Sequence, residues 1–163
     1  MTVPPWSAAY VCTVLVAYSA DRFNARGPHA VGAMLVAAAG FLGSAVLPAD
    51  AFGARYGCLI VACCGAFSAF PPLLCWLSSN LGPEGTAATG LAIAMNVSIG
   101  APGQIVGVWI YKDNEKLKGY PTGHFTNLGL TLLSATLTFG LWLWYRRENQ
   151  KIRRSGNGVL WKL

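Results

Sequence analysis

The feature that most restricts the fold of this sequence is a series of long stretches without any charged residue. Only 11% of the 163 residues are charged, whereas an ordinary soluble domain carries about 25%. The charges are also bunched, and the stretches between them exceed the roughly 20 residues that a helix needs to cross a bilayer. The uncharged stretches are Gly27–Ala49, Tyr56–Pro83, Gly85–Tyr111 and Gly119–Tyr145. We therefore predict an all-α integral membrane protein, because so few charges cannot form the polar surface of a soluble domain.

A fifth and shorter apolar stretch, Val3–Ala20, lies at the beginning of the chain. Pro4 and Pro5 stand where a helix tolerates proline, because its first backbone donors have no partner. A secretory signal peptide is not favoured, since the first basic residue, Arg22, follows the apolar stretch instead of preceding it. We expect about five transmembrane helices, near residues 3–20, 30–46, 56–77, 87–111 and 125–145, with the lipid bilayer as their surroundings.

The basic residues predict the orientation of these helices. If the loop after the first span and the tail at residues 146–163 share one side of the membrane, that side holds eight of the twelve Lys and Arg residues. The eight are Arg22, Arg26, Arg146, Arg147, Lys151, Arg153, Arg154 and Lys162; the other four are Arg55, Lys112, Lys116 and Lys118. Basic residues accumulate in cytoplasmic loops, so we predict a cytoplasmic C-terminus with a basic tail and an external N-terminus. Because these residues alternate with apolar spans, the net charge of +6 does not indicate a nucleic-acid partner.

Two polar residues inside the fourth span are the first candidates for function. Asn96 and Gln104 are eight residues apart, close to two helical turns, so they lie roughly on one face. Nearby, Gly100, Pro102 and Gly103 weaken regular helix, and broken helices at membrane depth commonly line substrate cavities. One interpretation is that Asn96 and Gln104 line a substrate pathway. The other is that they only form hydrogen bonds to a neighbouring helix.

Two further groups of residues suggest conformational roles. Pro71 and Pro72 remove two backbone donors from the third span and are predicted to kink it, either as a gate or only to fit neighbouring helices. In the loop after the first span, Arg22 and Arg26 suit a cytoplasmic position, but Asp21 is not explained by the charge rule. A carboxylate at the membrane edge can pair with a basic residue or with the positive N-terminal end of another helix, so we predict that Asp21, Arg22 and Arg26 form a latch that exists in only one conformation.

No arrangement of residues in the sequence supports an enzyme, a metal site or a bound cofactor. His29 and His124 stand near span ends without a carboxylate close by in the sequence, and the stretch GPEGTAATG lacks the lysine of a phosphate-binding loop. The five cysteines lie within apolar spans without the paired spacing of metal ligands, so we interpret them as small packing residues. Glycines pack helices closely in lipid, and Gly103 and Gly107 form one small-xxx-small pair.

The order of several motifs resembles the second half of major facilitator superfamily transporters. The motifs are VPPW, YSADRFNARGP, AFPPLLCWLSSNLGPEGTAATGLAIAMNVSIGAPGQIVGVWIY and YPTGH, and the resemblance is greatest to the anion:cation symporter branch that includes the fungal allantoate permeases. The matching residues are Asp21, Arg22, Arg26, Gly27 and Pro28 in the loop, Trp76 and Asn80 in a Trp-x-x-x-Asn stretch, and Asn96, Gly100, Ile110 and Tyr111 in the next span.

This resemblance implies a fold and a function. The five spans would correspond to helices eight to twelve of a twelve-helix fold, with the first seven helices absent from this chain. The carrier would reside in the plasma membrane and take up a small organic anion with protons, by alternating access around a midplane site. Trp76 and Asn80 would then join Asn96 and Gln104 along the substrate pathway. The alternative is a five-span protein that packs or scaffolds in the membrane without transport.

Overall fold

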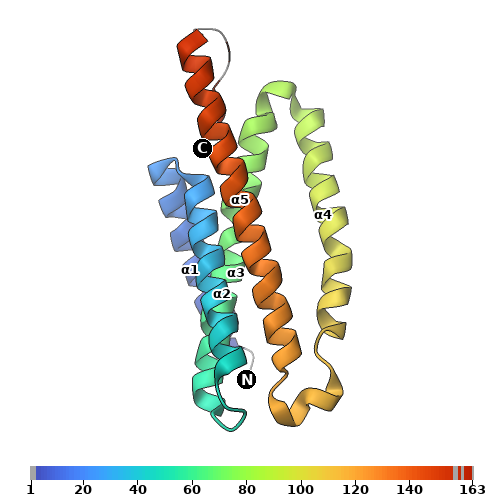
Figure 1. Ribbon diagram of the computed structural model, residues 1–163. Helices are drawn as coiled ribbons and strands as arrows, with labels where there is room; N and C mark the ends of the chain where they lie inside the picture. Colours follow the sequence, from blue (N-terminus) through green and yellow to red (C-terminus); the bar gives the residue numbers. More distant parts are fainter. Residues whose placement is uncertain (1–2, 156–157, 159, 163) are drawn as a thin grey trace.

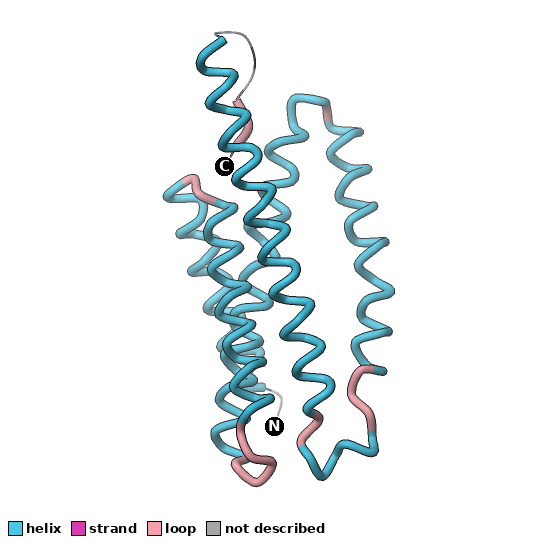
Figure 2. Tube along the Cα trace, in the orientation of Figure 1, coloured by secondary structure: helices cyan, strands magenta, loops and turns pink. Residues whose placement is uncertain are grey.

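A computed structural model describes residues 3–155, 158 and 160–162, and within them the chain forms a bundle of long helices joined by short connections (Figure 1). Five α-helices occur in the described residues: α1 (Val3–Phe23), α2 (Arg26–Val46), α3 (Phe52–Leu81), α4 (Thr86–Trp109) and α5 (Pro121–Ser155). Two short 3₁₀ helices, η1 (Gly82–Glu84) and η2 (Asp113–Lys118), lie in the connections on either side of α4. The helices run up and down, with the loops at the two ends of the bundle (Figure 2).

Each stretch expected to span the membrane coincides with one helix, although most of the helices are longer than the stretches. The clearest difference is at α5, which continues from the apolar stretch through the basic residues to Ser155. The helix continues beyond its apolar part because the following residues favour helix. An ion pair within it, 2.9 Å between Lys151 Nζ and Glu148 Oε2, adds to this. Within the tail predicted at residues 146–163, positions 156–157, 159 and 163 lie outside the described residues.

Within the described residues, four helical segments are long and apolar enough to cross a membrane. They are α2, α3 together with η1, α4 and α5. The first helix, α1, is not among them, because two Pro and several Ser, Thr and Tyr residues lower the mean hydropathy of its uncharged part. A transmembrane role for α1 stays a prediction.

The closest helix contact in the bundle is between α2 and α3, and it is made by residues with very small side chains. On α2, Ala33, Ala37 and Gly40 are buried, and on α3 so are Ala62 and Gly65. A Cβ atom added at Gly65 would lie 2.6 Å from the Ala33 carbonyl oxygen and 2.8 Å from the Ala37 Cα atom. The two backbones therefore touch, as helices in membranes do where small residues face each other.

The helices α1 and α5 pack around this pair. Trp6 of α1 contacts Phe67 of α3, with ring centroids 4.9 Å apart. At the start of α2, Gly27 leaves room for Trp142 of α5, whose Cδ1 atom would be 2.8 Å from a Cβ atom at that position. Between α1 and α2, Asn24 adopts a φ of 48°, a left-handed conformation that asparagine tolerates and that allows the chain to reverse.

In contrast, α4 stands apart from the other helices (Figure 1). It contacts α3 and has no buried residue, and a Cβ atom added at Gly100, Gly103 or Gly107 would meet nothing within 4 Å. The predicted small-xxx-small pair at Gly103 and Gly107 is therefore not a helix contact in this structure. The expected weakening around Pro102 also does not break α4, which is one continuous helix.

The α2–α3 contact predicts opposite effects for two glycine substitutions on one helix. Gly65→Ala should lower the free energy of unfolding by about 1–3 kcal/mol, because the new methyl group has no room between the backbones. Gly57→Ala, where a Cβ atom would meet nothing within 4 Å, should raise it by up to about 1 kcal/mol through helix propensity. Denaturant titration in detergent micelles, followed by far-UV circular dichroism, measures both; equal midpoints would contradict the described packing.

Candidate functional site

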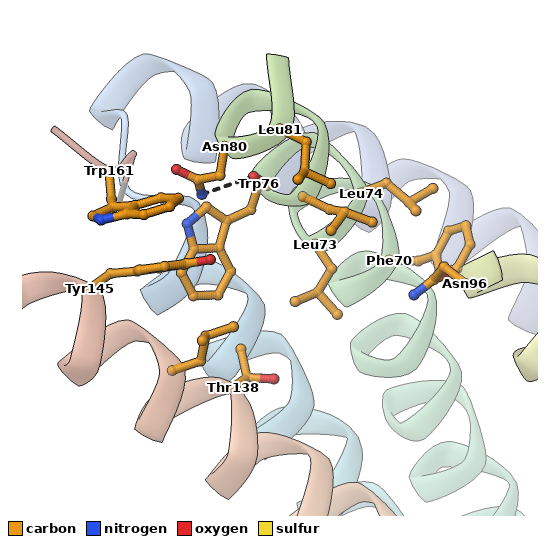
Figure 3. A pocket seen from close by; sticks show the side chains of 12 residues that line it. Phe70, Leu73, Leu74, Trp76, Asn80, Leu81, Asn96, Thr138, Tyr145 and Trp161 are labelled. Carbon is orange, nitrogen blue, oxygen red and sulfur yellow. Dashed lines mark hydrogen bonds between the residues drawn. The ribbon is translucent and has the colours of Figure 1, made fainter. Parts of the chain in front are cut away.

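A pocket of about 330 Å³ lies between α3, α4, α5 and the end of the chain (Figure 3). Three of the four residues predicted to line a substrate pathway meet there: Trp76, Asn80 and Asn96. The rest of its lining is Phe70, Leu73, Leu74, Leu77 and Leu81 of α3, Thr138, Leu141 and Tyr145 of α5, and Trp161 near the C-terminus. The pocket is thus mainly apolar with a few polar groups, as small-molecule sites commonly are.

The residues Trp76 and Asn80 lie one turn apart on the same face of α3. The Trp76 side chain is buried, with 3% of its surface exposed, and its ring meets Tyr145 of α5 edge to face, at a centroid distance of 5.6 Å. Asn80 Nδ2 donates a hydrogen bond to the Trp76 carbonyl oxygen at 3.0 Å. The indole and the amide are both neutral hydrogen-bond donors, which can bind a carboxylate without adding a charge to the pocket.

Both residues also bind the backbone near the end of the chain. Trp76 Nε1 donates to the Lys162 carbonyl oxygen at 2.8 Å, and the Lys162 amide donates to Asn80 Oδ1 at 2.7 Å. From α5, Asn149 forms a similar pair of hydrogen bonds with Trp161. Sequence reasoning missed Asn149 and Trp161, since it considered the tail only as a basic cytoplasmic segment; a tryptophan in a charged tail was the available signal.

The two polar residues of α4 are not brought together in one site. Asn96 borders the pocket opposite Trp76 and lies next to Phe70 (Figure 3), whereas Gln104 does not line it. Both residues are exposed. Within the described part of the chain, neither side-chain amide forms a hydrogen bond to another helix.

Two of the three predicted latch residues contact each other and reach α3. Arg26 forms an ion pair with Asp21, 2.9 Å between Nη2 and Oδ1, and its Nε atom donates to the same oxygen at 3.0 Å. Arg26 Nη1 also donates to the Cys75 carbonyl oxygen at 3.0 Å and to the hydroxyl of Ser79. Asp21 and Arg22 lie in the last turn of α1 and Arg26 begins α2, so they are not in a loop as predicted. The Arg26 side chain therefore connects the end of α1 to the last turns of α3, while Arg22 is exposed and takes no part.

The loop is also held by His29. Its Nδ1 atom lies 2.6 Å from the Ala25 carbonyl oxygen, which can only accept a hydrogen bond, so Nδ1 carries the proton. The Nε2 atom lies within hydrogen-bond distance of Ser19 Oγ of α1, at 3.0 Å. The imidazole thus joins the end of α1 to the first turns of α2.

The prolines and cysteines show no additional site. The helix α3 continues through Pro71 and Pro72, of which Pro72 is buried, and a kink with a gating role stays a prediction. All five cysteines are free, and among the described residues no group of three or more His, Cys, Asp or Glu side chains could hold a metal ion.

Comparison with curated proteins finds transporters. The MFS transporter prlL of a fungal species (strain NRRL 50135) is 56% identical over 160 residues, which cover 98% of this chain and 32% of prlL. An uncharacterized transporter of Schizosaccharomyces pombe is 25% identical over 151 residues, which cover 93% of this chain and 29% of that protein. No protein-family model and no solved structure matches the chain.

The chain therefore spans about a third of the length of the curated relatives that it matches. Over nearly its whole length it is homologous to a major facilitator superfamily transporter, and with its apolar helices it is an integral membrane protein. Transporters are not enzymes, which agrees with the sequence-based prediction that this chain is not one.

The Arg26 contacts predict unequal effects for neighbouring arginines. Arg26→Gln should lower the free energy of unfolding by about 1–2 kcal/mol, because the hydrogen bond to the Cys75 carbonyl and the ion pair are both lost. Arg22→Gln is the matched control and should change it by less than about 0.5 kcal/mol. Asp21→Asn should fall between them, since its side chain is 58% exposed and exposed pairs contribute little. Denaturant titration in detergent micelles measures these changes. Equal losses of unfolding free energy for the two arginine variants would contradict this role of Arg26.

Proposed function

We propose that this chain forms part of a major facilitator superfamily carrier, of the anion:cation symporter branch, that takes up a small organic anion together with protons. The observation that carries the proposal is the 56% identity to an MFS transporter over 98% of the chain. The five helices would correspond to helices eight to twelve of a twelve-helix fold. Alternating access would occur around a site shared with the helices that this chain lacks.

The pocket supports an organic anion as the substrate. Its walls are mainly apolar side chains, which suit the carbon skeleton, and Trp76, Asn80 and Asn96 offer neutral donors for a carboxylate. Gln104 lies on the same helix as Asn96, farther along the exposed face of α4. We propose that Gln104 joins the pathway when the absent helices cover α4.

The proton-binding group is assigned to the absent helices. Proton relays within membranes use ionisable residues that face the bundle interior. The four uncharged stretches of this chain contain no Asp or Glu, and Asp21 lies at the end of α1, in an exposed ion pair. A carboxylate from the other helices would therefore carry the proton, while this chain supplies neutral contacts to the anion.

The Asp21–Arg26 pair is proposed to act as the conformational latch. Arg26 contacts α3 at the two residues that directly precede Trp76 and Asn80, through the Cys75 carbonyl and the Ser79 hydroxyl. A movement of this end of α3 during transport would break these contacts, so they stabilise one state of the carrier over the other. Bending of α3 at Pro71 and Pro72 would allow such a movement.

The alternative function is a five-span protein that packs or scaffolds in the membrane without moving a solute. One observation favours it: α4 has no buried residue, so the chain does not enclose its candidate site by itself. The same exposed face is what a missing set of helices would cover. The two proposals differ in whether a complementary part restores uptake.

We expect that this chain alone does not transport. In sealed vesicles with a proton gradient and a panel of small carboxylates, the purified chain should give no saturable uptake, because the site lies between two bundles and only part of one is present. Co-expression with the seven-helix N-terminal part of a matching carrier should restore gradient-dependent uptake, and that part alone is the control. Uptake by the 163-residue chain on its own would disprove the fragment proposal, and no uptake from the combination would favour the scaffold.

The proposed orientation places the α1–α2 loop, the α3–α4 connection and the tail in the cytoplasm of a plasma-membrane protein. These three segments lie at the same end of the bundle (Figure 1), and two of them, the α1–α2 connection and the tail, hold eight of the twelve basic residues of the chain. A reporter that is active only in the cytoplasm should therefore be active when fused after Leu163. The same reporter inserted in the α4–α5 connection should be inactive. The reverse pattern in a well-expressed, inserted protein would overturn the orientation.

A further inference from the structure

The end of the chain returns to the helix bundle and binds it through its backbone. The Trp161 amide donates to Asn149 Oδ1, and Asn149 Nδ2 donates to the Trp161 carbonyl oxygen, both at 2.8 Å. The Lys162 amide donates to Asn80 Oδ1 at 2.7 Å, and Asn80 Nδ2 donates to the Lys162 carbonyl oxygen at 3.3 Å. Each asparagine thus pairs with both backbone groups of one residue.

This pattern of hydrogen bonds is the one by which a side-chain amide binds the backbone of an extended polypeptide. A side-chain amide has one acceptor and a donor group side by side, so it can replace a neighbouring strand for one residue. In an extended segment, successive residues direct their backbone groups to opposite sides. Accordingly, Asn149 of α5 binds Trp161 and Asn80 of α3 binds the next residue, Lys162, so the segment is held from two helices.

The side chain of Trp161 adds an apolar anchor. Its ring stacks on Tyr145 of α5, with centroids 5.1 Å apart and planes at 16°, and lies 6.4 Å from the Trp144 ring. Figure 3 shows Trp161 beside Tyr145 and Asn80, where it forms one wall of the pocket. The indole of Trp76 donates to the Lys162 carbonyl oxygen as well, so two of the proposed anion-binding donors are engaged by the chain itself.

We propose that the ends of α3 and α5 form a binding site for an extended peptide segment, and that its occupant is the chain's own residues 160–162. Trp161 supplies specificity through its ring, and Lys162 contributes only its backbone. While docked, the segment closes one end of the pocket and occupies the donors of Trp76 and Asn80. If the pocket binds an anion, as proposed above, that anion must displace the segment from these donors, so the segment is a built-in competitor for the site.

Docking depends on the described contacts and not on transport, so it is tested without a substrate. The measurement is hydrogen–deuterium exchange of the Trp161 amide in the full chain in detergent micelles, with a free peptide of residues 156–163 as the reference. The amide should exchange at least about fivefold more slowly in the chain than in the peptide, as expected for a hydrogen bond of ordinary strength. Exchange at the free-peptide rate would overturn the proposal.

Two substitutions of Lys162 test whether the site reads the backbone. Lys162→Ala keeps the amide and should leave the protection of Trp161 unchanged. Lys162→Pro removes the donor to Asn80 and should reduce that protection about fivefold. Because both changes lie outside the helices, neither disturbs the bundle. Loss of protection in the alanine variant, or full protection in the proline variant, would contradict a backbone-reading site.

A second pair of variants tests the helix side of the contact. Asn149→Leu removes both hydrogen bonds to Trp161 while keeping a good helix former, so the Trp161 amide should exchange at the free-peptide rate. Gln150→Leu, at the adjacent exposed position of α5, is the matched control and should behave like the unaltered chain. Protection that survives Asn149→Leu would show that the segment is held elsewhere, and the proposed site would be wrong.

Discussion

The arrangement of the whole bundle depends on how closely the backbones of α2 and α3 approach. Gly40 and Gly65 have no side chain to keep the helices apart, and each faces an alanine of the other helix. The helices α1 and α5 pack around the α2–α3 pair. The α2–α3 contact therefore determines where Trp76 and Asn80 of α3 lie relative to α5. In a bilayer, burying apolar surface between helices gains little, so such close contact between small residues is the main attraction.

Much of the fold follows from the charge pattern, because hydrocarbon excludes charged side chains and so the uncharged stretches coincide with helices. The ends were less predictable, since α5 continues as a helix through residues that leave the membrane. The prediction of which glycines pack against another helix also failed for Gly103 and Gly107. In the sequence they look no different from Gly40 and Gly65, and only the position of the neighbouring helix distinguishes them.

The candidate site was predicted in part for similar reasons. Trp76, Asn80 and Asn96 meet at one pocket because helical spacing and neighbouring helices bring them together. The partner of Asn80 could not be inferred, since Lys162 is distant in the sequence and uses only its backbone, which carries no residue-type signal. Likewise, the charge of Arg26 predicts a position at the membrane edge, but its hydrogen bond to the Cys75 carbonyl depends on the α1–α2 turn.

Because α5 is long, the tail can make two kinds of contact: its arginines with lipid headgroups, and its last residues with the helices. A helix of 35 residues is about 52 Å long at 1.5 Å per residue, well beyond a hydrocarbon layer of about 30 Å. Its last turns are therefore among the lipid headgroups or in water, where their arginines can attract anionic phospholipids. The contacts of Asn80 and Asn149 involve only neutral groups, so ionic strength should weaken the lipid attraction without loosening the docked segment.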